Sequence, residues 1–401
     1  MDGQLTDKGR DTTFALGQRL GHLYIDQLGF MPRVMDSPGQ IQIRSTVITR
    51  AQESVQQAYA GMYPASNRQY PPTIVTRKQT EQTLAPNDSK CKRFAELSAE
   101  YSKRAAKRWN DTPEMAYLQK MLNKYMFKEA KNDNKGILVD SHPRASGVLD
   151  HINTTLAHGP ATKLPVDFYD PTVIKYLDKI VTDEWFAGYQ ESTEYRRLGI
   201  GGLAGDVVSW MVEHVEGEAA TTGSSVESTS ATKAERPFKF AMSGAHDTTL
   251  AAFLASFGAF DNRWPFYTSH IAIELFKNKK ETDKEAQKDN NSITSAITSL
   301  LPSSLSSTTS IAHKDAGKVD PKDLERLKGY YVRLRYNDRP VTVPGCRAPG
   351  KHLEGNETFC TLEEFKRIAD KFKPKDFVNE CNMDLGKSAF PEKVVPPGFS
   401  S

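Results

Sequence analysis

Two short segments with strand patterns, each followed closely by a helical pattern, constrain the fold of this chain most. Ile41–Ser45 has the pattern of a strand and precedes a helical pattern over Thr49–Met62. Phe238–Ser243 is also typical of a buried strand, and a helical pattern over Thr248–Phe257 follows it. In α/β proteins the ends of such strands meet at one edge of a sheet, where ligands bind. We therefore expect the polar residues that follow the two strands to share one wall of a pocket.

The remaining pattern predicts an α/β fold with a central mixed sheet flanked by helices and an inserted helical cap. Residues 83–201 are mostly helical by pattern, with breaks at prolines. We expect residues 1–82 and 202–401 to form the α/β domain and residues 83–201 to form the cap. Two later segments of the α/β domain have strand patterns: Ile271–Phe276 and Tyr330–Tyr336.

Two segments are too polar to bury a face against a core. Residues 217–235 are rich in Ser, Thr, Ala and Gly, and residues 277–322 are rich in Lys, Asp, Ser and Thr without aromatic side chains. Such composition is typical of disordered chain. We expect both segments to be disordered surface insertions in the α/β domain.

The charge balance and the hydropathy argue against two classes of protein. The 401 residues include 53 Lys and Arg against 50 Asp and Glu, a net charge of +3. The chain therefore lacks the basic excess that is typical of nucleic-acid-binding proteins. A membrane-spanning helix needs about 18–20 apolar residues, whereas the longest apolar run, Leu250–Phe260, already contains Ser256 and Gly258. We expect neither a nucleic-acid partner nor a membrane span.

Metal and nucleotide sites also lack support in the sequence. The nine histidines include no pair four residues apart, and the cysteines form no Cys-x-x-Cys, so we expect no metal site. Gly199, Gly201 and Gly202 superficially resemble a dinucleotide-binding loop, but a helical pattern precedes them where that loop requires a strand. Close helix packing or a helix cap is the better interpretation.

The two strand ends carry residues with the chemistry of an anion site. Arg44 and Arg50 flank hydroxyl side chains after the first strand, and the planar guanidinium suits bidentate contacts to phosphate. His246 and Asp247 follow the second strand, at the start of a helix whose N-terminus favours anions. Taken separately, solvated arginines and a capping Asp with an incidental His explain each segment without a ligand.

Taken together, the two segments resemble the branch of the histidine phosphatase superfamily that contains acid phosphatases and phytases. Arg-Ser-Thr-x-x-x-Arg at residues 44–50 is joined by His-Asp-Thr-Thr at residues 246–249. Gly-Gln-Leu-Thr-x-x-Gly at residues 3–9 is similar to the helix that follows the family's catalytic strand, and residues 260–265 are similar to the lysophosphatidic-acid phosphatase subgroup. Two further segments resemble the C-terminal disulfide region of acid phosphatases: Val343–Cys346 and Cys360–Phe365.

The resemblance implies a phosphoglycerate-mutase-like fold and hydrolysis of a small phosphomonoester through a phosphohistidine intermediate. Arg50, with Arg44 closer to the strand, is then expected to bind the substrate phosphate, and His246 to hydrogen-bond the same oxygens. Asp247 is expected to protonate the leaving alcohol and later to activate water. No metal or organic cofactor is implied. The substrate stays open between lysophosphatidate and other phosphomonoesters.

One feature of the family is missing from the sequence. Members carry Arg-His-Gly-x-Arg, whose histidine takes the phosphoryl group, upstream of the Gly-x-Leu-Thr helix, and no Arg-His-Gly occurs here. We expect the chain to be truncated at its N-terminus relative to the family and to have little or no phosphatase activity as given. The alternatives are a noncatalytic relative that binds a phosphorylated ligand or a partner protein, and an unrelated α/β protein with chance motifs.

The resemblance also implies two disulfides, Cys91 with Cys381 and Cys346 with Cys360, whereas four cysteines by themselves allow three connectivities. These pairs favour a secreted, vacuolar or lysosomal protein whose complete gene encodes a signal peptide, with a mitochondrial location as the alternative. The sequence does not indicate an oligomeric state. Asn-x-Ser/Thr sequons favour a glycoprotein and occur at Asn87, Asn110, Asn153, Asn290 and Asn356.

Overall fold

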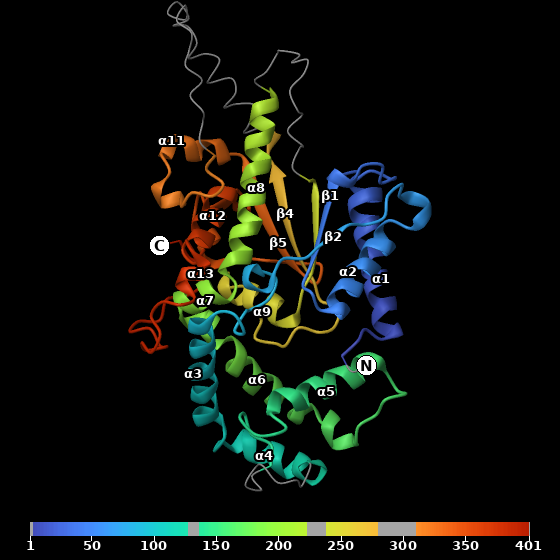
Figure 1. Cartoon of the computed structure of the whole chain (residues 1–401), viewed down its shortest axis with the longest axis vertical. Coiled ribbons are helices and arrows are strands. Elements are labelled where there is room, and N and C mark those ends of the chain that lie inside the picture. Colours follow the sequence, from blue (N-terminus) through green and yellow to red (C-terminus); the bar gives the residue numbers. More distant parts are fainter. Residues whose placement is uncertain (1–2, 127–135, 223–237, 280–309, 401) are drawn as a thin grey trace, which may run out of the picture. The chain divides into compact units, whose positions relative to one another are not determined.

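The computed structural model describes residues 3–126, 136–222, 238–279 and 310–400 of the chain (Figure 1). The chain forms two compact units, each made of segments that are distant in the sequence. The first unit holds both residues 1–82 and residues 83–201, and a separate cap domain stays a prediction. The first unit comprises Met1–Gly202, Phe238–Ser269 and Pro374–Pro397, and the second comprises Leu203–Pro237, His270–Lys373 and Gly398–Ser401.

The first unit contains a parallel three-stranded sheet in the order β2-β1-β3. β1 (Ile41–Ser45) lies between β2 (Ile74–Val75) and β3 (Phe240–Gly244), and Ser45 is opposite Gly244. Because the strands run in the same direction, their carboxyl ends lie at one edge. The bounds predicted for β1 are confirmed, and β3 forms where the second strand was predicted.

Two helices of the first unit, α1 (Asp7–Gly21) and α2 (Thr49–Met62), pack closely against each other. Figure 1 shows both in blue beside β1. A Cβ atom on Gly17 would lie 1.9 Å from a carbonyl oxygen of α2, and one on Gly61 would lie 2.1 Å from a carbonyl oxygen of α1. Only glycine at these two positions permits the observed approach of the helices.

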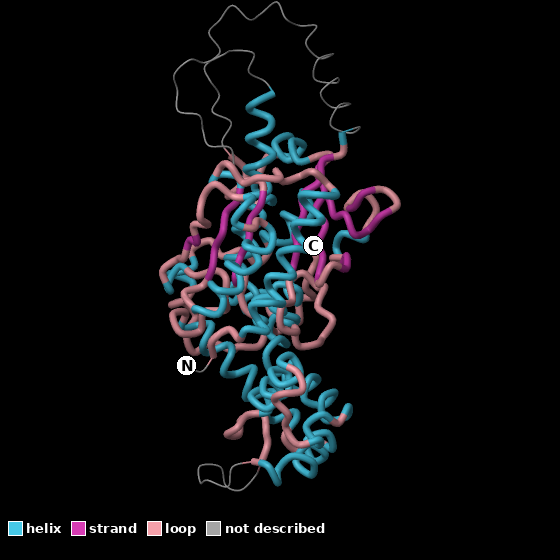
Figure 2. Tube along the Cα trace, turned by 90° about the vertical axis from the view of Figure 1, so that its right-hand side faces the viewer, coloured by secondary structure: helices cyan, strands magenta, loops and turns pink. Residues whose placement is uncertain are grey.

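Residues 83–201 fold mostly as helices, which Figure 2 shows as cyan coils joined by loops. The core that these helices share includes the fully buried side chains of Leu118, Ile152 and Leu177. Two further helices, α9 (Asp247–Ser256) and α13 (Phe377–Glu380), belong to the same unit. The helices within residues 83–201 are α3 (Lys92–Trp109), α4 (Pro113–Leu122), α5 (Ala145–His158), α6 (Pro171–Glu191) and α7 (Thr193–Gly199).

The second unit contains an antiparallel sheet in the order β4-β5-β8-β7, with β6 also paired to β5. Parallel strands in one unit and antiparallel strands in the other, together with many helices, confirm the α/β fold class. The strands are β4 (Ile271–Lys277), β5 (Tyr330–Tyr336), β6 (Arg339–Val341), β7 (His352–Leu353) and β8 (Asn356–Thr361). The helices are α8 (Gly201–Thr222), of which the second unit holds the residues from Leu203 onward, α11 (Pro321–Leu324) and α12 (Leu362–Asp370).

The structure corrects the limits of both predicted insertions. α8 continues to Thr222, β4 includes Lys277, and residues 310–322 contain a 3-10 turn and α11. The reason is local packing: Ile311 is fully buried, and its backbone N–H donates to the Glu216 carboxylate at 2.9 Å. A buried side chain with a bonded backbone holds a segment whose overall composition is polar. The rest of the predicted insertions, residues 223–235 and 280–309, lies outside the described residues.

Each unit contains one disulfide. Cys91, directly before α3, pairs with Cys381 in the first unit, and Cys346 pairs with Cys360 in the second. The Cα–Cα distances are 4.6 Å and 5.2 Å, within the usual window of about 4.4–6.8 Å. Both pairings implied by the resemblance are therefore present. Within the described ranges, we find no helix of the length and apolar character that crossing a membrane requires.

Candidate functional site

The strand register brings the two candidate segments together at the carboxyl ends of β1 and β3. Arg44 lies opposite Ser243 in the sheet, and the backbone N–H of Thr46 donates to the Gly244 carbonyl at 3.3 Å. A Cβ atom on Gly244 would lie only 2.4 Å from the carbonyl oxygen of Ala51, in the first turn of α2. Glycine is therefore required where the start of α2 passes the segment that leads into α9.

His246 is the N-cap residue of α9, and its imidazole faces the end of β1. Its Nε2 atom is hydrogen-bonded to the Thr46 hydroxyl at 3.0 Å. Its backbone N–H donates to the Thr249 hydroxyl, which in turn donates to the Leu84 carbonyl at 2.6 Å. These bonds fix both the backbone and the ring, so the imidazole has a defined position at the sheet edge.

The guanidinium of Arg50 is exposed and close enough for its charge to act on His246. Burial lowers the pKa of the His246 imidazole, the positive charge of Arg50 lowers it further, and the carboxylate of Asp247 opposes both effects. One guanidinium nitrogen of Arg50 donates to the Gly3 carbonyl at 3.3 Å. An exposed guanidinium beside an imidazole is an arrangement that suits an anionic ligand.

Both carboxylate oxygens of Asp247 accept a hydrogen bond. The backbone N–H of Thr248 donates to Oδ1 at 2.7 Å, and the indole N–H of Trp264 donates to Oδ2 at 2.8 Å. Trp264 is itself held, because its backbone N–H donates to Asp178 at 2.8 Å and its ring packs edge-on against Trp185. In the sequence, Trp264 is noted only as part of a subgroup motif. The number of residues between Trp264 and Asp247 does not predict their contact.

Arg44 differs from Arg50 in its surroundings. Its side chain is buried, and one guanidinium nitrogen donates to the Thr83 hydroxyl at 2.8 Å. Arg77 donates to the same hydroxyl at 3.2 Å. Arg44 thus fixes the segment around Thr83 against β1, and its expected contact with phosphate stays a prediction.

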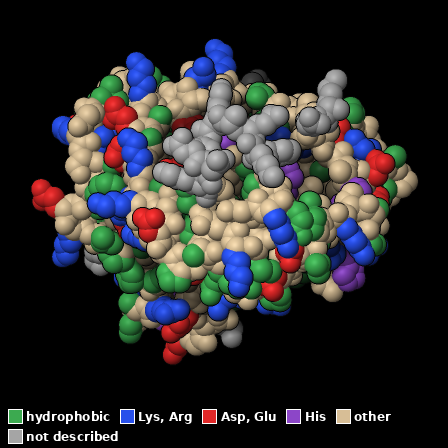
Figure 3. Space-filling model, turned by 90° about the horizontal axis from the view of Figure 1, so that it is seen from below, with side chains coloured by type: hydrophobic (Ala, Val, Ile, Leu, Met, Phe, Trp, Pro, Cys, Tyr) green, Lys and Arg blue, Asp and Glu red, His purple; other side chains and the backbone are tan. Residues whose placement is uncertain are grey.

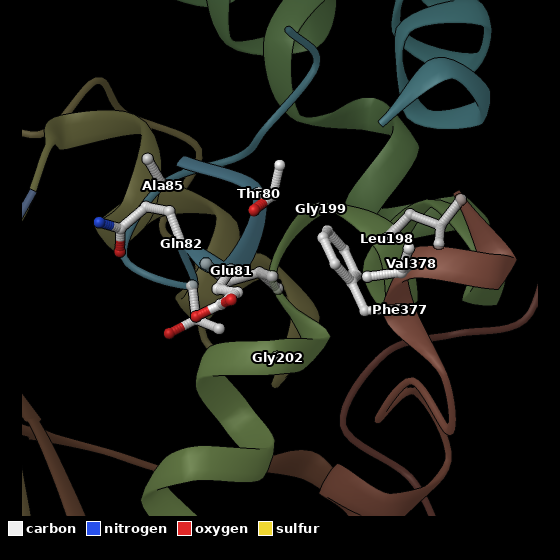
Figure 4. Close-up of a pocket in the computed structure, with 11 residues that line it drawn as sticks. Thr80, Glu81, Gln82, Ala85, Leu198, Gly199, Gly202, Phe377 and Val378 are labelled. Atoms are coloured by element: carbon white, nitrogen blue, oxygen red, sulfur yellow. The ribbon is translucent and has the colours of Figure 1, made fainter. Parts of the chain in front are cut away.

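A cavity of ≈ 150 Å³ in the first unit is lined by none of the predicted site residues. Figure 4 shows residues 80–85 on one side of it, with Gly199 and Phe377 on the other. A Cβ atom on Gly199 would lie 2.5 Å from the Tyr189 hydroxyl oxygen, which supports close helix packing as the reason for this glycine. Thr83 lines this cavity, and its hydroxyl also accepts the hydrogen bond from Arg44.

The charges of the described residues form no obvious single-sign surface on the face shown in Figure 3, where Lys and Arg side chains are interspersed with Asp and Glu. Within the described part of the chain, no group of three or more His, Cys, Asp or Glu side chains is placed to hold a metal ion. The positive charge of Arg50 acts directly on His246.

The site thus combines an arginine that follows one strand with a His-Asp pair that begins a helix after another strand. The sequence of the chain also matches a known protein family. Residues 1–295 match the Histidine phosphatase superfamily (branch 2). The chain belongs to this family. The recognition made from residues 44–50 and 246–249 is thereby confirmed.

Similar proteins carry phosphatase names. The protein named probable acid phosphatase in Schizosaccharomyces pombe is 34% identical over 383 residues, which cover 94% of this chain and 76% of that protein. Lysophosphatidic acid phosphatase type 6 of Homo sapiens is 26% identical over 279 residues, which cover 69% of this chain and 57% of that protein. The match thus spans less than two thirds of the lysophosphatidic acid phosphatase. The chain is an acid phosphatase-like member of the family.

Solved structures of phytases share the fold. The phytase from Citrobacter braakii has a TM-score of 0.52 at 12% identity, and the match covers 94% of this chain and 89% of that one. The Klebsiella sp ASR1 phytase has a TM-score of 0.54 at 13% identity, with 94% and 88% covered. At these identities the likeness concerns the fold alone.

Proposed function

We propose that this chain binds small phosphomonoesters through Arg50 and His246 and presents Asp247 to the leaving group. One observation carries the proposal: Thr46, at the end of β1, is hydrogen-bonded to the His246 ring at 3.0 Å. This bond joins the two segments that the family uses around phosphate. The proposal is supported by the two helices that follow these strand ends, because α2 begins with Arg50 in its first turn and α9 begins at Asp247.

Each residue has a role that follows from its surroundings. The exposed guanidinium of Arg50 forms charge-assisted hydrogen bonds with phosphoryl oxygens. His246 donates to the same oxygens, and its lowered pKa means that binding a phosphate dianion draws a proton onto the ring. Asp247 protonates the leaving oxygen, and the two donors on its carboxylate hold it in one orientation.

The covalent step of the family requires a histidine nucleophile. The sequence has no Arg-His-Gly-x-Arg, so the chain as given supplies the phosphate and leaving-group side of the site without that residue. We therefore propose binding with little turnover. The second candidate function, a noncatalytic relative that binds a phosphorylated ligand, is favoured by the same absence. Lysophosphatidate is one candidate ligand, because a relative is named for it.

The test of binding is titration calorimetry with inorganic phosphate on the purified chain. We expect Arg50→Ala to weaken binding by about tenfold or more, since charge-assisted hydrogen bonds are the stronger kind. Arg33→Ala, which removes an exposed arginine elsewhere in the first unit, is the matched control and should bind as the parent does. Equal affinities of the parent and Arg50→Ala would contradict the proposal.

The test of turnover is an aryl-phosphate assay between about pH 4 and 7, since this class uses a protonated acid at the leaving group. We expect a rate near the uncatalysed background, because losing a nucleophile costs several powers of ten. Asp247→Asn is the control. Robust turnover that disappears in Asp247→Asn would mean that another residue of this chain acts as the nucleophile.

A further inference from the structure

The loop that carries Trp264, the indole partner of Asp247, continues into two exposed aromatic residues. Tyr267, in the segment that follows α9, is 55% exposed. Its hydroxyl donates to the Asp150 carboxylate at 3.1 Å and is hydrogen-bonded to the Thr154 hydroxyl at 2.7 Å, so it bridges to α5. The neighbouring Phe266 is 65% exposed. Two exposed aromatic residues are therefore adjacent in the chain, and Asp247 acts on the Tyr267 hydroxyl.

The charged groups that act on the Tyr267 hydroxyl are both carboxylates. Burial raises the pKa of the Tyr267 hydroxyl, and the carboxylates of Asp150 and Asp247 raise it further, so both acids lie near it. The nearby Arg263 acts on Asp178, a different carboxylate. The leaving-group side thus combines exposed aromatic surface with two acidic groups.

We propose that Phe266 and Tyr267 bind an uncharged aromatic or other apolar part of the substrate alcohol, and that Asp150 disfavours alcohols carrying further phosphates. The inference rests on the proposed function, because Asp247 must meet the leaving oxygen, and the rest of the alcohol then extends past it. Aromatic rings favour flat or apolar groups through stacking and burial. A carboxylate without a paired cation repels additional phosphate groups.

A purely structural role for Tyr267 predicts different effects of substitutions at Tyr267 and Phe266. If its hydroxyl only attaches the loop to α5, Tyr267→Phe should loosen the loop and Phe266→Ala should do nothing to ligand binding. If the rings bind the alcohol, Tyr267→Phe should keep the affinity because the ring stays. Tyr267→Ala and Phe266→Ala should lose it. These variants separate the two roles.

The experiment compares three probes by titration calorimetry on the full chain: methylphosphonate, benzylphosphonate and myo-inositol hexakisphosphate. We expect benzylphosphonate to bind about tenfold more tightly than methylphosphonate, an advantage of the size that burying one ring gives. Phe266→Ala and Tyr267→Ala should remove this advantage without changing the methylphosphonate affinity. Tyr70→Ala, at another exposed tyrosine of the first unit, is the control and should keep it.

Asp150→Lys tests the charge. We expect it to raise the affinity for myo-inositol hexakisphosphate several-fold and to leave methylphosphonate unchanged. Equal affinities for the two phosphonates, or tightest binding of the hexakisphosphate to the parent chain, would overturn the inference while Arg50-dependent phosphonate binding still supports the proposed function. Methylphosphonate binding that Arg50→Ala does not weaken would overturn both. A thermal melt of each variant identifies misfolding. If Tyr267→Ala or Asp150→Lys does not fold, the inference is tested with Tyr267→Phe and Phe266→Ala.

Discussion

Two charges of opposite sign act on the His246 imidazole at the sheet edge. Its ring is bonded to Thr46, the cation of Arg50 disfavours its protonation, and Asp247 favours it. Burial and the charge of Arg50 lower the pKa of His246 by more than the Asp247 carboxylate raises it, so the net effect is a lowered pKa. The state of the ring therefore depends on whether a second anion is bound beside it.

Removing the Arg50 cation should raise the pKa of His246, since a positive neighbour disfavours the protonated ring. The measurement is an NMR pH titration of the histidine ring resonances in the parent chain and in Arg50→Ala. Arg33→Ala should leave the His246 titration where it is. An unchanged titration in Arg50→Ala would mean that the two side chains do not share one wall of a pocket.

The lowered pKa of His246 also makes stability depend on pH. The unfolded chain takes up a proton near the ordinary value of 6.5, before the folded chain does, so it binds more protons in the interval below 6.5. The contribution is fully present above 6.5 and is lost as the pH falls toward the folded pKa. Urea unfolding at about pH 7.5 and pH 5.5 should show a smaller loss in His246→Gln than in the parent. Equal losses would contradict the shift.

Trp264 should stabilise the fold through its bond to Asp247. Trp264→Phe keeps an aromatic ring but removes the indole donor, and a hydrogen bond to a charged group is worth about 1.5–3 kcal/mol when buried. Because the pair is partly exposed, we expect a loss of about 1–2 kcal/mol in the free energy of unfolding. In an Asp247→Asn background the same change should cost less. Equal costs in both backgrounds would show that the bond contributes nothing.

At the scale of elements, the sequence predicts what a local pattern can encode. β1 and α2 are predicted within their observed bounds because a short strand pattern that ends in polar residues is followed by a helical repeat. β2 has only two residues, Ile74 and Val75, and exists because β1 lies beside it, so no periodicity reveals it. The end of α8 is missed for a related reason, since its last turns are held by a segment about a hundred residues away, through bonds such as that from Ile311 to Glu216.

The contact between α1 and α2 should be the least tolerant of added volume. Gly17→Ala places a methyl group where a carbonyl oxygen of α2 lies, 1.9 Å away. The helices must then separate, at a cost of about 1–3 kcal/mol or more. Gly147→Ala in α5, where nothing lies within 4 Å of the added Cβ, should stabilise by up to about 1 kcal/mol. Urea unfolding of the two variants checks both signs, and a neutral Gly17→Ala would contradict this packing.

At the scale of the whole molecule, the chain order does not give the division into units. Residues 374–397 return to the first unit, although the chain before them belongs to the second. A local pattern carries no information about such returns, whereas the family resemblance does, through the pairing of Cys91 with Cys381. The sequence predicts part of the candidate site, because Arg50 and His246 each follow a strand and strand ends meet at one edge of the sheet. The bond from Trp264 to Asp247 depends on how a loop folds back onto α9.

The two disulfides should differ in what they contribute, because they close loops of different length. Cys91–Cys381 spans 290 residues and Cys346–Cys360 spans 14. The chain-entropy model gives about 5–6 kcal/mol for the first and about 3 kcal/mol for the second, as upper values. Replacing both cysteines of a pair by serine removes that constraint from the unfolded chain. It leaves the native bonds of the C-terminal segment, such as those from the buried Arg93 to the Lys387 and Ser388 carbonyls. We therefore expect the Cys91/Cys381 variant to fold and to unfold at lower urea concentration than the Cys346/Cys360 variant. The reverse order would mean that native packing, and not loop closure, sets the contribution of these bridges.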